Sequence, residues 1–201
     1  MSIRYPRPLR PGDVIGVTAP SSGVEPELRP RLDFAVEGLR MDTPYDVPQP
    51  LLSWLDVTTL PQGATFTLSS PGVQGRNHWN WADNPRATEY TWTGTGTWRR
   101  HDGDGPVEVT GRLVGGCIET LCNLAGFFDA ATAVLVGRTR APDTRTLSQY
   151  DAVLDALGGL GVPLVVDVEC GHVPPYLPLV NGALGRLQLD GEDGSLTQTL
   201  A

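Results

Sequence analysis

The first 40 residues predict a strand and a helix, and the sequence then leaves the pattern that such a unit requires. Residues 13–19 are a short apolar run typical of a buried strand, and residues 26–40 place apolar side chains at helical spacing. A second strand should follow, but residues 41–50 are rich in proline. Because a parallel strand needs neighbours on its edges and cover on both faces, we predict an incomplete N-terminal α/β domain over residues 1–75.

The second half of the chain predicts a more complete domain. Apolar or alternating runs predict strands at residues 64–69, 107–113, 132–137, 162–168 and 183–189. Residues 148–160 predict an amphipathic helix whose apolar face holds Tyr150, Val153, Leu154 and Leu157. From Asp190 onward the sequence reads as a polar tail. These elements predict a β-rich α+β domain over residues 107–201.

A tryptophan-rich segment, residues 76–106, lies between the two predicted domains. It holds four of the five tryptophans of the chain, which are Trp79, Trp81, Trp92 and Trp98. Alternation around Tyr90 and Trp92 suggests a hairpin or a long loop. The aromatic side chains could form a stacking platform for a sugar or a base, or fill a small core of the hairpin itself.

Charge and composition exclude several classes of function. The chain has 23 acidic and 15 basic residues, a net charge of −8, and all its basic residues are arginine. This charge disfavours binding to nucleic acid or to anionic membranes, and the absence of lysine excludes Schiff bases and Ser-Lys dyads. No apolar run is long enough to span a membrane, and the N-terminus does not resemble a signal peptide. With only three cysteines, we expect a cytoplasmic protein without a disulfide scaffold.

Among the candidate site residues, His172 is the most suggestive. It directly follows a buried strand, where catalytic side chains are often displayed, although position alone favours a loop histidine hydrogen-bonded to the backbone. Cys170 and His172, with Cys117 and Cys122, match zinc spacing poorly, and we expect no metal. No serine lies in a Gly-x-Ser elbow.

Several segments in order resemble the LD-carboxypeptidase family, which are serine peptidases that include the microcin C self-immunity proteins. The matching segments are LRPGDVIGVTAPSS at residues 9–22, MDTPY at 41–45, GRLVGGCIETL at 111–121, VGRT at 136–139, CGHVPP at 170–175 and LVNGA at 179–183. The resemblance implies a remnant of a parallel α/β nucleophile domain followed by a β-rich α+β C-terminal domain. It points in particular to the microcin-immunity branch.

The resemblance also implies a chemistry and a partner. Family members use a Ser-His-Glu triad in which serine attacks an amide carbonyl and histidine transfers its proton. His172 matches the family histidine, and Trp79 and Trp81 match the region of a loop that stacks on a nucleotide-like group. The expected partner is a murein LD-peptide or a microcin-like peptidyl-nucleotide, and no cofactor is expected.

Two triad members have no match in this sequence. The family serine lies in an elbow between segments that are joined here at Arg40 and Met41, and the family glutamate lies between segments that are joined at Gly126 and Phe127. We therefore expect a serine carboxypeptidase by family with little or no activity. The alternative is a non-catalytic binding protein or an internally deleted remnant. A sheet edge left open would favour self-association as a homodimer.

Overall fold

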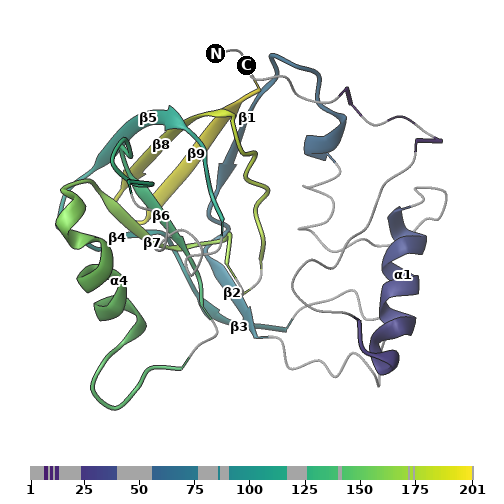
Figure 1. Cartoon of the computed structure of the whole chain (residues 1–201), viewed down its shortest axis with the longest axis horizontal. Helices are drawn as coiled ribbons and strands as arrows, with labels where there is room; N and C mark the ends of the chain where they lie inside the picture. The colour runs from purple at the N-terminus through teal and green to yellow at the C-terminus, as the bar shows by residue number, and fades with distance from the viewer. Residues whose placement is uncertain are drawn as a thin grey trace.

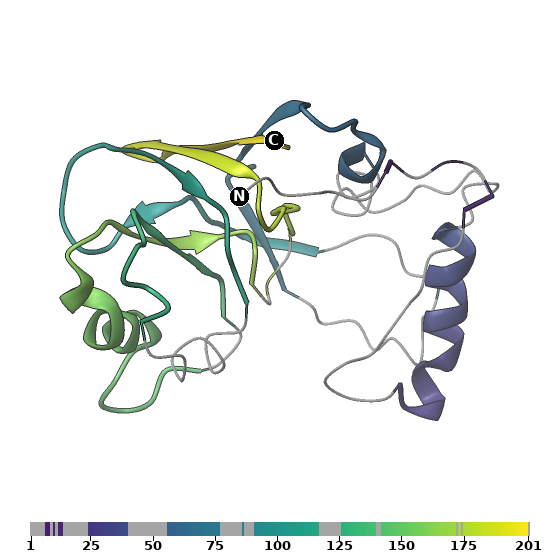
Figure 2. The same cartoon turned by 45° about the horizontal axis from the view of Figure 1, so that its top comes forward.

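The computed structural model describes residues 7–8, 10, 12–13, 24–39, 56–76, 86, 91–116, 126–139, 142–171, 173 and 175–200. The N-terminal helix lies where the sequence predicts it, as a 3₁₀ turn η1 (Pro26–Leu28) that continues into α1 (Arg29–Leu39). It stands apart from the sheets in both views (Figures 1 and 2). Arg86 forms an ion pair with Glu37 of this helix at 3.2 Å. The predicted strand at residues 13–19 falls almost entirely outside the described residues.

The described strands form three sheets. A four-stranded antiparallel sheet has the order β1-β9-β8-β5, a two-stranded antiparallel sheet pairs β2 with β3, and a three-stranded sheet has the order β4-β7-β6. In the last sheet β6 and β7 are parallel and β4 is antiparallel. The strands are β1 (Thr65–Ser69), β2 (Val73–Arg76), β3 (Thr91–Thr95), β4 (Arg99–Arg100), β5 (Val107–Arg112), β6 (Val134–Gly137), β7 (Leu164–Val168), β8 (Leu184–Asp190) and β9 (Asp193–Thr199).

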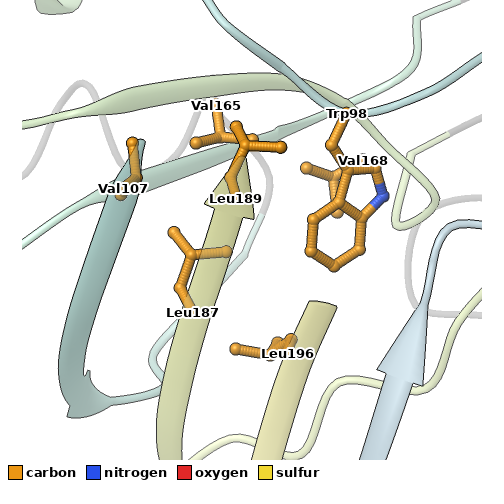
Figure 3. Close-up of a cluster of buried hydrophobic side chains, with 7 residues drawn as sticks. All are labelled: Trp98, Val107, Val165, Val168, Leu187, Leu189 and Leu196. Atoms are coloured by element: carbon orange, nitrogen blue, oxygen red, sulfur yellow. The ribbon is translucent and has the colours of Figure 1, made fainter. Parts of the chain in front are cut away.

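The hydrophobic core joins the two larger sheets, which Figure 2 shows as two layers. Its buried members, drawn in Figure 3, are Trp98, Val107, Val165, Val168, Leu187, Leu189 and Leu196. Each fully buried aliphatic side chain of this kind contributes about 1.5–3 kcal/mol. Gly194 makes room for the indole, since a Cβ there would lie 2.6 Å from a ring carbon of Trp98. The core therefore combines Trp98, from the predicted tryptophan-rich segment, with side chains from the C-terminal half of the chain.

Strand pairing also crosses the domain boundaries that we predict at residues 75 and 106. β1 pairs with β9 in register from Thr65↔Thr199 to Ser69↔Ser195, and β4 pairs with β7. Residues 65–69 thus share a sheet with the C-terminal half of the chain, and residues 98–100 share a sheet and the core with it. The three-part division stays a prediction about independent folding units.

The helix α4 (Gln149–Leu157), followed by η2 (Gly158–Leu160), confirms the predicted amphipathic helix. Ser148 caps it through a capping box with Asp151, which satisfies backbone donors that the first helical turn leaves free. The predicted apolar face is only partly covered, because Leu157 is buried but Tyr150 and Leu154 are exposed. The apolar face of this helix therefore packs only in part against the rest of the protein.

The prediction of a polar tail from Asp190 onward was wrong, because residues 193–199 form β9, an inner strand of the four-stranded sheet. A two-residue turn at Gly191 and Glu192 joins it to β8, with Asp190 opposite Asp193. Gly191 has φ of 58°, the conformation for which glycine is preferred at the first position of a tight hairpin turn. Residues 193–199 therefore belong to the sheet and do not form a tail.

Candidate active site

The predicted catalytic histidine belongs to the loop that follows β7. Strands β6 and β7 are parallel neighbours, so their carboxyl ends meet at one edge of the sheet. β6 ends just before Arg138, and β7 ends just before Glu169, Cys170 and Gly171. His172 itself lies outside the described residues, as do Trp79 and Trp81, so the structure does not test whether these three residues come together.

The backbone holds this loop at its base. The N–H of Leu177 donates to the carbonyl of Glu169 at 2.7 Å, which closes the loop between residues 169 and 177. The N–H of Cys170 donates to the carbonyl of Val168 at 2.8 Å, and the N–H of Arg138 donates to the same carbonyl at 3.2 Å. These three bonds fix the start and the end of the segment that carries His172.

Two glycines allow the ends of β6 and β7 to approach closely. A Cβ on Gly137 would lie 2.5 Å from the backbone nitrogen of Gly171, and a Cβ on Gly171 would collide with the backbone of Gly137 and Arg138. Only glycine at both positions permits this backbone contact. The residue immediately before His172 therefore packs directly against the end of β6.

A buried carboxylate lies beneath the loop. The Glu169 side chain is 0% exposed and the Arg138 side chain 3% exposed, and the two form an ion pair at 2.8 Å. Glu169 Oε1 also accepts a bond from the Ser70 hydroxyl at 2.7 Å, while Oε2 accepts one from the Trp98 indole N–H. Both carboxylate oxygens are occupied, so Glu169 serves as a structural anion and not as an exposed base.

Arg138 extends the same network to the backbone. Its two terminal nitrogens donate to the carbonyls of Val73 at 3.0 Å and Gly96 at 2.8 Å. Its Nε is buried and has no hydrogen-bond partner. The pair thus connects loops that follow β1, β3, β6 and β7.

Cys170, between Glu169 and Gly171, is a poor nucleophile at neutral pH. Desolvation by the surrounding protein, followed by the negative charge of Glu169, raises the pKa of its thiol to about 11. Its side chain still reaches the surface, and it is a free cysteine. Since the thiolate is the reactive form, this cysteine stays protonated and weakly reactive under ordinary conditions.

A second acidic residue of β7 forms a more exposed cluster. Asp167 accepts bonds from Arg99 Nε at 2.9 Å and from the Tyr150 hydroxyl at 2.7 Å, and the Arg99 guanidinium lies 4.7 Å from the centre of the Tyr150 ring. Asp167 has φ of 65°, the left-handed region that side chains other than those of glycine, asparagine and aspartate rarely adopt. Burial, followed by the bond to Asp167, raises the pKa of Tyr150.

The comparisons with known proteins address the same part of the chain. Residues 122–187 match the model of the LD-carboxypeptidase C-terminal domain. The match includes β6, β7 and the loop with His172, and it confirms the family resemblance seen in the sequence. No curated protein matches the chain significantly.

Solved structures support the same fold. The microcin C7 self-immunity protein MccF in complex with aspartyl sulfamoyl adenosine is 19% identical, with a TM-score of 0.53, over 74% of this chain and 54% of that one. An MccF-like protein from Bacillus anthracis is 14% identical, with a TM-score of 0.55, over 77% and 57% of the two chains. The chain spans about half the length of these structures. The mixed α/β fold expected for the C-terminal LD-carboxypeptidase domain is confirmed, whereas the N-terminal nucleophile domain is not.

Among the described residues of the tryptophan-rich segment, Trp98 does not belong to a ligand platform. Its side chain is fully buried in the core and donates to Glu169. For this residue the structure favours the packing interpretation of the tryptophan cluster. β2 and β3 form the antiparallel pair expected of a hairpin in this region, although β2 begins at Val73, before the predicted segment.

Sequence reasoning missed Arg138, Glu169 and Ser70. The available signal was the position of two charged residues directly after apolar strands, where burial requires a partner of opposite charge. Among the described residues, no group of three His, Cys, Asp or Glu side chains could hold a metal ion. No helix in the described ranges is long and apolar enough to cross a membrane.

Proposed function

We propose that this protein binds the small substrates of the LD-carboxypeptidase family and hydrolyses their amide bonds slowly. The candidate substrates are murein LD-peptides and microcin-like peptidyl-nucleotides. The observation that carries the proposal is the family domain match over residues 122–187, which contains the loop of His172 at the carboxyl end of β7.

In this proposal His172 accepts and returns the proton during amide cleavage. A histidine suits this role because its pKa lies near neutral pH. The closed base of the loop supports it, because a general base acts only when it is held at a defined place.

The slow rate follows from the two unmatched triad members. No segment of this sequence resembles the motif of the family serine or of the family glutamate, since Arg40 is followed directly by Met41 and Gly126 by Phe127. Without an aligned nucleophile, His172 can only activate water, and removal of a nucleophile typically lowers turnover by several orders of magnitude.

For ligand binding, we propose that Trp79 and Trp81 stack on a nucleobase. MccF structures contain aspartyl sulfamoyl adenosine and glutamyl sulfamoyl guanosine, which suggests aminoacyl-nucleotide analogues as probes for this chain. Stacking of a base on an aromatic ring is worth about 1–3 kcal/mol, so replacing either tryptophan should weaken binding measurably.

The test combines binding with turnover. Calorimetry would measure the affinity for aspartyl sulfamoyl adenosine, and chromatography would follow D-alanine release from an LD-linked tetrapeptide, for the natural chain and for His172→Ala. An intact family member serves as positive control for the peptide assay. We expect binding, together with slow release that the His172→Ala substitution abolishes.

The alternative is a non-catalytic binding protein, which the absence of a serine elbow favours. Tight binding of the analogue without any release of D-alanine would support this alternative. Release at the rate of the intact control would mean that another residue acts as the nucleophile. Absence of both binding and release would contradict the proposed function.

A further inference from the structure

The Arg138–Glu169 pair lies where it can control the loop of His172. Arg138 is the first residue after β6 and Glu169 the first after β7, so their ion pair joins the carboxyl ends of two parallel strands. The same carboxyl ends carry the close contact between Gly137 and Gly171. The ion pair and the contact between the two glycines therefore both hold the end of β6 against the end of β7, and we call this region the junction.

The polar bonds of the pair lead to two other parts of the chain, residues 70–73 and residues 96–98. Glu169 receives Ser70 from the loop after β1 and Trp98 from the segment before β4. Arg138 donates to the carbonyls of Val73 and Gly96. Removing Arg138 would leave the carbonyls of Val73 and Gly96 without this donor and Glu169 with only Ser70 and Trp98 as side-chain partners.

Stability alone is a weak reason for such a pair. Desolvation of two charges offsets much of their attraction, and apolar residues of similar volume are often equally stabilising. What apolar residues cannot reproduce is the direction of the hydrogen bonds that a guanidinium imposes on a carboxylate. The pair is thus better suited to fixing geometry than to adding stability.

The backbone carries this geometry to position 172. Glu169 accepts the bond from Leu177 that closes the loop, and Gly171 packs on the backbone of Arg138. In the sequence, His172 directly follows Gly171 and precedes Val173. A shift of Glu169 would therefore displace the described residues at the two ends of the loop, Gly171 and Leu177.

We propose that Arg138 is a positioning residue for His172, which acts by holding the Glu169 carboxylate across the ends of β6 and β7. This inference rests on the proposed function, because it assigns His172 the proton transfer. It adds a residue that touches neither substrate nor reacting atoms.

The test uses a double variant, Arg138→Met with Glu169→Met, which removes the pair without leaving a buried charge. Its matched control is Arg186→Met with Glu108→Met, which removes an exposed Arg–Glu pair joining β8 and β5. Three quantities are measured: the thermal unfolding midpoint, the nitrogen NMR signals of the histidine rings, and kcat and KM for D-alanine release. The three histidines, His78, His101 and His172, are assigned with His172→Ala.

We expect the double variant to unfold cooperatively at a moderately lower midpoint, because Ser70 and Trp98 lose their acceptor, while the His172 ring signals shift and those of His101 do not. We also expect kcat to fall about a hundredfold with KM unchanged, the size of effect that a small misplacement produces. Unchanged His172 signals and unchanged kcat in a folded double variant would overturn the proposal. The control pair should change none of these quantities.

Two further outcomes remain informative. If the double variant does not fold, Glu169→Gln, which keeps the shape of the side chain, is measured in the same way, and unshifted His172 signals would again overturn the proposal. If the natural chain shows no turnover, the proposed function fails on that assay. The ring signals still decide whether Arg138 positions His172.

Discussion

Two arginine–carboxylate pairs near the end of β7 use the same chemistry in opposite surroundings. Glu169 and Arg138 are 0% and 3% exposed, whereas Asp167 and Arg99 are 17% and 47% exposed. Each carboxylate also accepts a bond from an aromatic side chain. The same set of partners thus creates a rigid junction in the interior and a weaker contact at the surface.

The free-energy cost of breaking such a pair depends on whether the remaining charge is left in water or in the interior. A charge at the surface regains water, so an exposed pair contributes only about 0.2–1 kcal/mol. A charge left alone in the interior cannot regain water, and breaking a buried pair therefore costs about 3–5 kcal/mol. We therefore expect substitutions at the buried pair to lower the free energy of unfolding more than substitutions at the exposed pair.

Glu169→Ala should have the largest effect. It leaves the Arg138 guanidinium buried without its carboxylate and removes the acceptor of Ser70 and Trp98. We expect the free energy of unfolding to fall by about 3–5 kcal/mol, measured by urea denaturation. Glu108→Ala, on the exposed pair with Arg186, should cost less than about 1 kcal/mol. Equal losses for the two variants would remove the basis of the comparison.

Gly171→Ala should have the next largest effect, because the new methyl group would collide with the backbone carbonyl of Arg138. Overpacking of this kind costs about 1–3 kcal/mol, and the same denaturation experiment measures it. Gly159→Ala is the matched control, since a Cβ there meets no atom within 4 Å. A Gly171→Ala variant as stable as this control would show that the two strand ends can separate freely.

Asp167→Asn should have a smaller effect. Asparagine tolerates the left-handed backbone at this position and still accepts a bond from Tyr150, but it loses the charge attraction to Arg99. We expect a loss below about 1 kcal/mol that decreases at high salt, because exposed pairs are screened. A loss as large as that of Glu169→Ala, independent of salt, would contradict the role assigned to solvent.

The thiol of Cys170 offers the mildest probe of the buried junction. With its pKa raised to about 11, it should remain largely protonated at pH 9, where an ordinary cysteine is about half ionised. Alkylation of the Cys170 peptide, followed by mass spectrometry, should therefore accelerate only as the pH approaches 11. Glu169→Gln should move this acceleration to lower pH, and rapid alkylation of the unsubstituted protein at pH 8 would contradict the assignment.

Much of the fold could be predicted where a strand or helix carries its own signal. The runs around β6, β7 and β8 and the capped helix α4 follow local patterns. β9 escaped prediction because two of its inward positions are Gly194 and Gln198. The Gln198 amide is buried and satisfied by Val180 N–H at 2.8 Å and the Pro178 carbonyl at 3.0 Å. An inward polar residue of this kind hides the alternation that predicts a strand.

The candidate site could be predicted only at its sequence-local part. The position of His172 after an apolar strand, and the family resemblance, pointed to the loop. The pair beneath it joins residues 31 positions apart, and Trp98 reaches Glu169 from 71 positions away. No local pattern contains such pairings, because they depend on the order of strands in the folded sheet.

The most direct test of this account is a pair of double-mutant cycles on the two ion pairs. Arg138→Met, Glu169→Met and their combination are compared by urea denaturation with Arg99→Met, Asp167→Asn and their combination. We expect a coupling energy of about 3 kcal/mol or more for the buried pair, with the double variant no less stable than either single variant, and below about 1 kcal/mol for the exposed pair. Similar coupling energies in the two cycles would contradict the claim that burial makes the Arg138–Glu169 junction the fixed point beneath the histidine loop.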